Sequence, residues 1–180
     1  MKTDVSAAPL DGSSDSFITF IGGFDRKLHP DFGGDAGGGD VFGFPYIIVD
    51  GAEPKRTVTF GFDDESDGHG VPFYPIPDEA ITMNGWIEGG LPGNVDQEGD
   101  RHMLIVDKTN NTLYELFDVF YNGTSWVAGS GAFFDMKTNN RRPEGWTSAD
   151  AAGLAILPGL VRYDEVFGPD EIRHAFRVTV

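Results

Sequence analysis

The segment from His102 to Met136 constrains the fold most, because runs of strand-forming residues alternate there with two asparagine turns. "HMLIV" leads to Asn110-Asn111, "TLYELFDVF" follows, and "SWVAGSGAFFDM" returns after Asn122-Gly123. β-Branched and aromatic residues bounded by such turns are typical of antiparallel strands. The pattern therefore predicts a three-stranded meander.

Two-residue turns at these positions set a predicted register for the meander. Glu115 should lie opposite Ser130 and Val106, and His102 opposite Val119. Because side chains alternate between the faces of a strand, one face should carry His102, Glu115, Phe117, Trp126 and Ser130. The same register separates Glu115 from His102 by about 13 Å, too far for a direct pair.

Composition supports a β-rich chain. The 25 glycines, 11 prolines and 13% aromatic residues favour short strands joined by turns, and 180 residues suit one domain with a real core. We expect a mainly β, loop-rich fold with one or two short helices, either a β-sandwich or a distorted barrel-like sheet. Residues 1–16 should be a loose N-terminal segment, and residues 17–180 a single β-rich domain.

Further elements are predicted on both sides of the meander. Residues 42–51 and 56–62 should form a strand pair, residues 16–23 a short extra strand, and residues 174–180 a final strand. The Gly-rich stretch 28–40 lacks the strand-then-helix setting of a phosphate-binding loop. "TSAD" predicts a short helix capped by Thr147 or Ser148 and closed by Gly153, and "VRYDEV" a turn or a single helical turn.

Charge limits the partners. The net charge of −16 repels phosphate backbones, anionic lipids and polyanionic substrates, so no nucleic-acid partner is expected. The absence of cysteine excludes disulfides and thiol catalysis. No apolar run reaches about 18 residues, so we expect no membrane insertion.

Several segments together resemble one family of uncharacterised secreted bacterial proteins. They include "GDRH", "LYEL", "RPEGWTSADAAGL" and "ILPGLVRYDEV", and the resemblance spans residues 28–179. It implies a secreted or extracellular location and assigns no activity. Asn111 stands where the family usually has a cysteine, and the sequence ends at Val180, before an extension that is common in the family.

Three carboxylates are candidate catalytic groups. Glu115 lies among apolar neighbours that would raise its pKa, as the general acid of glycan hydrolysis requires. Asp135 and Asp150 are candidates for the second carboxylate. The alternatives are structural: Glu115 bonded to an arginine or a backbone amide, Asp135 forming a turn, and Asp150 at a helix end.

A histidine and an aromatic surface complete the candidate site. His102 follows Asp100-Arg101, where an acid could orient its ring, although a lone strand histidine is more often a packing residue. Substrate contacts are predicted for Trp126, Trp146 and Tyr114 as apolar surfaces, Ser130 within the small-residue gap "AGSGA", and Arg162. Arg162 could instead belong to a local salt-bridge cluster with Asp164 and Glu165.

No metal site is expected from the scattered histidines, and no cofactor is otherwise implied. "DDESDG" could give an irregular calcium site at Asp63, Glu65 and Asp67, but Tyr74 stands where the closing glutamate would be. A solvated acidic turn is the favoured alternative.

These features predict an exported domain that hydrolyses or binds a neutral polysaccharide or cell-wall glycan through carboxylates beside an aromatic cleft. A different class also fits the sequence. In a noncatalytic module of the cell envelope or extracellular matrix, the buried polar groups would only join loops to a sheet.

Overall fold

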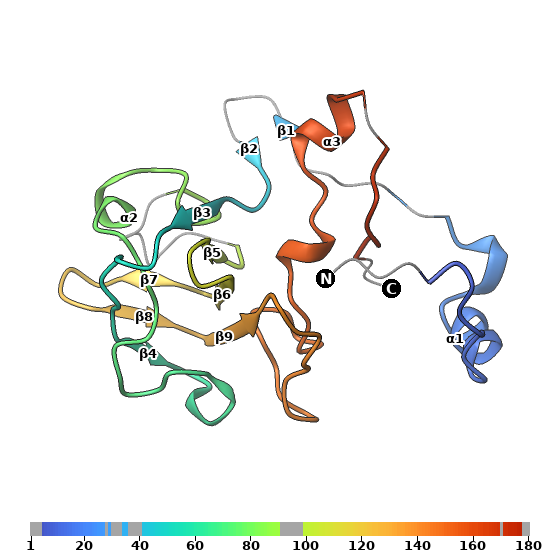
Figure 1. Cartoon of the computed structure of the whole chain (residues 1–180), viewed down its shortest axis with the longest axis horizontal. Helices are drawn as coiled ribbons and strands as arrows, with labels where there is room; N and C mark the ends of the chain where they lie inside the picture. Colours follow the sequence, from blue (N-terminus) through green and yellow to red (C-terminus); the bar gives the residue numbers. More distant parts are fainter. Residues whose placement is uncertain are drawn as a thin grey trace.

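The protein is mainly β, as predicted. The structure is a computed structural model that describes residues 5–27, 29, 34–35, 41–90, 99–169 and 171–177. One sheet has the strand order β3-β5-β6-β9, a second has the order β4-β8-β7, and β1 pairs with β2 (Figure 1). In the described residues the sheets do not close into a barrel. The strands are β1 (Gly34–Asp35), β2 (Val41–Phe42), β3 (Tyr46–Val49), β4 (Val58–Phe60), β5 (Met103–Asp107), β6 (Thr112–Phe117), β7 (Phe120–Tyr121), β8 (Trp126–Ala128) and β9 (Ser130–Asp135).

The helices of the described residues are all short. They are α1 (Ser14–Phe20), α2 (Glu79–Thr82), α3 (Tyr163–Phe167) and the 3-10 turns η1 (Gly23–Asp25), η2 (Asp63–Glu65) and η3 (Leu157–Gly159). The strand predicted at residues 16–23 is wrong, because that stretch falls largely in α1, whose first turn carries Asp15. The single helical turn predicted in "VRYDEV" is confirmed as α3. In Figure 1 the two large sheets lie on one side of the view and α1 on the other.

The predicted meander is present, but both of its turns are displaced by one residue. Asp107 pairs with Thr112, and Asn122 N donates to Ser125 O at 3.1 Å, so the chain reverses at residues 109–110 and 123–124. The register therefore shifts by two residues, and Glu115 lies between Leu104 and Ala132. A shift of two preserves the pleat, so residues of the first sheet keep their predicted faces.

Side chains within the turns explain this displacement. The Asp107 carboxylate accepts the N–H groups of Thr109 and Asn110, both at 3.0 Å. Asn122 Oδ1 accepts the N–H groups of Thr124 and Ser125 at 3.0 and 2.9 Å. Such Asx turns place the polar residue at the start of the turn and not at its centre.

The meander also bends from one sheet into the other. Asp118, with φ of 53°, separates β6 from β7, and Gly129 separates β8 from β9. Gly129 N donates to Phe117 O at 2.8 Å, so the two bends lie side by side. The bend breaks the alternation of faces, and the prediction that Trp126 shares a face with Glu115 is wrong. Trp126 instead lies in the main core.

The strand pair predicted at residues 42–51 and 56–62 is also corrected. Both segments contain strands, but β3 pairs in parallel with β5, and β4 in parallel with β8. The two segments therefore belong to different sheets, and the connection at residues 50–57 runs from one sheet to the other.

Two apolar clusters cover the two faces of the first sheet. The main core contains residues of both sheets, among them Tyr74, Met103, Tyr114, Leu116 and Trp126. On the opposite face, Leu104 packs with Ala149 and Ile156, and Phe117 and Leu157 lie against them. Residues 147–160, called the docked segment below, thus cover part of this second face.

Polar groups occupy the outer edge of β9. Ser66 Oγ accepts Gly131 N at 3.2 Å, the Asp67 carboxylate accepts Phe133 N at 2.9 Å, and Asp67 N donates to Gly131 O at 3.0 Å. The segment 63–67 thereby supplies partners for three backbone groups of this edge.

The ends of the chain need one further correction. Residues 174–177 are not a strand, so that part of the final-strand prediction is wrong, and residues 178–180 lie outside the described residues. The Gly-rich stretch 28–40 lies mostly outside them as well. No helix in the described part of the chain is long and apolar enough to cross a lipid bilayer.

Candidate functional site

The structure brings His102, Glu115 and Ser130 together on one face of the first sheet, beneath the docked segment. His102 precedes β5 and lies against Phe117, with 5.7 Å between ring centroids, and Ser130 pairs with Phe117 from the other side. Glu115 is two residues from Phe117 on β6. His102 and Glu115 are therefore diagonal neighbours, about 7–8 Å apart between backbones, and not the 13 Å of the predicted register.

Glu115 is fully buried, with 0% of its surface exposed. Its carboxylate accepts Ile156 N at 2.8 and 3.0 Å on its two oxygens, and Leu157 N at 2.9 Å. These amides lie at the start of η3, where no earlier carbonyl can accept them. Burial raises the pKa of Glu115 to about 7, although the two amides, His102 and Arg177 act to lower it. The carboxylate is thus a buried anchor of the docked segment with no surface open to a ligand.

His102 anchors the same segment at its other end. Its Nε2 lies 3.0 Å from Ala149 O, and its Nδ1 lies 2.7 Å from the Glu88 carboxylate. The ring of Phe44 packs edge-on against it at 4.9 Å. An acid does orient the His102 ring, but that acid is Glu88 and not Asp100.

The stretch "TSAD" forms a polar turn instead of the predicted helix. Ser148 Oγ accepts Asp150 N at 2.9 Å and lies 2.7 Å from Leu154 O, and these bonds hold the backbone in a turn. Ser130 Oγ donates to Ser148 O at 2.6 Å. Side chains of serine often compete with helical hydrogen bonds in this way. Gly153 has a φ of 71° in the turn, as its predicted role in closing the segment requires.

Asp150 faces a cation. Its carboxylate lies 2.7 Å from Arg177 Nη2 and accepts Ala152 N at 3.1 Å. Arg177 also packs over Gly159, where an added Cβ would approach its Cγ to 2.6 Å. The C-terminal stretch therefore holds the docked segment from outside, while Glu115 and His102 hold it from the sheet.

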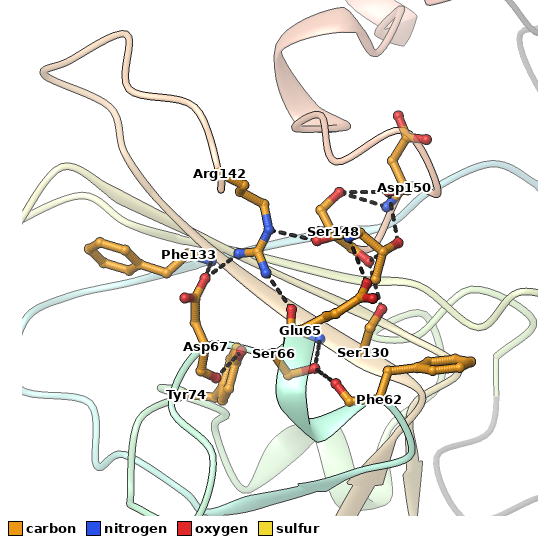
Figure 2. Close-up of polar contacts among 12 residues, drawn as sticks. Phe62, Glu65, Ser66, Asp67, Tyr74, Ser130, Phe133, Arg142, Ser148 and Asp150 are labelled. Atoms are coloured by element: carbon orange, nitrogen blue, oxygen red, sulfur yellow. Dashed lines mark hydrogen bonds and ion pairs between the residues drawn. The ribbon is translucent and has the colours of Figure 1, made fainter. Parts of the chain in front are cut away.

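A second polar cluster, centred on Arg142, fixes the chain just before the docked segment (Figure 2). The guanidinium contacts the Asp67 carboxylate and donates to Glu65 O at 2.6 Å and Thr147 O at 2.7 Å. Only 4% of the Arg142 side chain is exposed. Arg142 was not singled out in the sequence. Its place in the sequence, close to Pro143 and Trp146, was the available indication of a structured site.

The acids proposed for calcium are engaged by this cluster. Asp67 bonds Arg142 and Phe133 N, and the Glu65 carboxylate accepts Thr147 N at 2.9 Å. Asp63 lies 3.8 Å from His69 at the surface. In the parts of the chain that the structure describes, no group of three or more His, Asp or Glu side chains is placed to hold a metal ion.

The aromatic candidates do not form one surface. Tyr114 and Trp126 are buried in the main core, each with 3% exposure, whereas Trp146 is half-buried over Arg142 at 5.4 Å. The gap expected at "AGSGA" is filled by the chain itself. On the face of Glu115, Ala132 is fully buried and Ser130 bonds the docked segment. On the main-core face, a Cβ on Gly131 would meet Tyr74 Oη at 2.3 Å and the Phe60 ring at 2.7 Å.

The two remaining candidates lie apart from this face. Asp135 is exposed at the end of β9, where its carboxylate accepts Lys137 N at 2.9 Å. Arg162 lies 2.6 Å from Glu165 and 3.7 Å from Asp164, which is the local cluster of the structural alternative. An open surface hollow of about 420 Å³ lies beside α1, lined by Asp15, Ser16, Thr19 and Phe20, and none of the predicted site residues contributes to it.

Fold and site together define a β-rich protein whose polar side chains on one sheet face bind a segment of its own chain. Comparisons with protein-family models, curated proteins and solved structures found no match for this chain.

Proposed function

We propose that this protein is a noncatalytic binding module of the cell envelope or extracellular matrix. One observation carries the proposal: Glu115, His102 and Ser130 all bind the backbone of the docked segment. A catalytic acid must reach the substrate atom that it protonates, directly or through one water. Glu115, His102 and Ser130 instead join the docked segment to the sheet, which is the arrangement expected of a noncatalytic module.

The proposed partner is a neutral polysaccharide or cell-wall glycan outside the cell. The charge of −16 repels anionic polymers and does not oppose a neutral chain. Trp146 offers a partly exposed ring, and its contact with Arg142 fixes that ring in place. Sugars stack on such aromatic faces.

Binding and turnover should be measured together on insoluble neutral polysaccharides and on a glycan array. We expect the wild-type protein to bind without releasing reducing sugar. Trp146→Ala should weaken binding, whereas Glu115→Gln should bind as the wild type does below its melting temperature. The proposal fails if the wild type releases sugar and Glu115→Gln does not.

Glycoside hydrolysis is the second candidate, and the pKa of Glu115 favours it. A carboxyl group that titrates at about 7 has the property required of a general acid at neutral pH. Because Glu115 has no exposed surface, substrate access would require the docked segment to leave the sheet. The same Glu115→Gln turnover measurement separates the two candidates.

A further inference from the structure

Both nitrogens of the His102 ring face hydrogen-bond acceptors. Nδ1 lies 2.7 Å from Glu88 Oε2, and Nε2 lies 3.0 Å from Ala149 O. A neutral imidazole carries one N–H and one lone pair, so it can donate to only one of these oxygens. The doubly protonated ring donates to both. Because 6% of the side chain is exposed, little water can replace a lost partner.

The groups around the ring come from several elements. Glu88 comes from the 87–90 turn and also accepts the backbone N–H of His102 at 3.2 Å. Glu115 comes from β6 and interacts electrostatically with His102. The docked segment contributes the carbonyl of Ala149, and the rings of Phe44 and Phe117 add no charge. Arg177, whose charge acts on Glu115, is paired with Asp150.

We infer that His102 and Glu88 form a proton-dependent clamp, which holds the docked segment on the sheet when the ring is charged and loosens it when the ring is neutral. After deprotonation, a ring lone pair faces either Glu88 or Ala149 O at hydrogen-bond distance, and one of these contacts must open. This clamp concerns regulation and goes beyond the proposed binding function. Loosening it exposes the apolar face at Leu104 and Phe117.

Glu115 acts in the same direction at the other end of the segment. Its pKa is raised by burial, so the folded protein binds a proton there more tightly than the unfolded chain does. The resulting stabilisation is complete in acid and is lost as the pH rises towards about 7. Both anchors therefore favour docking in acid, although the clamp itself rests on the geometry of His102.

Hydrogen exchange of peptides covering residues 147–160 tests the clamp on the full chain. Protection should be compared at about pH 5.5 and about pH 8, which bracket histidine titration, after correction for intrinsic exchange rates. We expect protection of this segment to fall severalfold at the higher pH, whereas peptides from β5 and β6 should change little.

Two variants test the His102–Glu88 pair separately from Glu115. In Glu88→Gln the amide oxygen can still accept the ring and backbone N–H groups of His102 but supplies no negative charge beside the charged ring. Docking should therefore already be weaker at the lower pH, and the difference between the two pH values should shrink. In His102→Gln the amide can still donate to Ala149 O but does not titrate, so the difference between the two pH values should shrink. The matched control is His69→Gln, an exposed histidine, which should behave as the wild type does.

Three results would overturn the inference. They are equal wild-type protection at both pH values, a full pH difference retained in Glu88→Gln, or loss of the whole difference in Glu115→Gln, which would assign the effect to Glu115. Glu88→Gln keeps the His102 ring in place and so gives an answer even where His102→Gln fails to fold.

Discussion

The carboxylate of Glu115 receives the backbone N–H groups of both Ile156 and Leu157, at 2.8 to 3.0 Å. Glu115 lies in the central region of β6, and the two amides begin η3. One buried side chain therefore joins the first sheet to a loop 41 and 42 residues further along the chain. The stability of the docked segment should depend on this contact.

Glu115→Gln should destabilise the protein. Both carboxylate oxygens accept the N–H of Ile156, so whichever way the new amide turns, its N–H2 group faces that donor. An unsatisfied buried group of this kind costs about 1–3 kcal/mol. Denaturant unfolding near neutral pH measures the change, with the exposed Glu144→Gln as the control. An unchanged midpoint would show that the contact contributes nothing to folding.

The pKa of Glu115 also predicts how the stability of the protein changes with pH. Its pKa rises from the ordinary glutamate value of 4.5 to about 7 in the folded protein. The folded state therefore binds more protons between these values, and its stabilisation is lost as the pH rises through this window. Across this window the free energy of unfolding should fall by roughly 3 kcal/mol at most. Unfolding curves measured across the window should show this decline in the wild type and a weaker one in Glu115→Gln.

Arg142→Ala should be more damaging than Arg141→Ala. The first substitution removes the bonds to Glu65 O and Thr147 O and leaves Asp67 without its cation. We expect the free energy of unfolding to fall by about 2–4 kcal/mol. Partial solvation of Asp67 keeps this value below the cost of breaking a fully buried pair. Arg141 is exposed and provides the matched control. Similar melting temperatures for the two variants would contradict the structural role of this cluster.

Gly131→Ala tests whether the space beside β9 is truly filled. The added methyl would approach Tyr74 Oη to 2.3 Å and Phe60 to 2.7 Å, and overpacking of this kind costs about 1–3 kcal/mol. Gly61→Ala is the control, because its Cβ would meet Gly129 at an ordinary 3.6 Å. If Gly131→Ala were neutral and Gly61→Ala were not, the packing described for this face would be wrong.

The strands and their faces could be predicted because alternation is a local property. Val, Ile, Phe and Tyr between turn residues identified β5, β6 and β9, and parity alone placed His102 and Glu115 on one side. The turn positions were wrong by one residue because Asp107 and Asn122 accept the amides of residues two and three positions later, so each begins its turn and does not lie at the centre.

Long-range partners could not be predicted in the same way. The parallel pairing of β3 with β5, the bend at Asp118 and the bonds of Arg142 each depend on residues far apart in the sequence. The predicted helix after Thr147 failed for a related reason, since Ser148 was given a capping role but in fact holds a turn that the sheet stabilises. The sequence therefore placed His102, Glu115 and Ser130 correctly on one face. It did not predict that residues 147–160 cover them.

Ser66 and Asp67 have a consequence for the protein in crowded surroundings. Unpaired strand edges recruit strands of neighbouring molecules and can seed fibres. At β9 the outward amides of Gly131 and Phe133 already have partners, so these groups cannot pair with a strand of another molecule. This protection would matter for a binding module of the proposed kind at high local concentration, because its copies would pair less readily through the edge of β9.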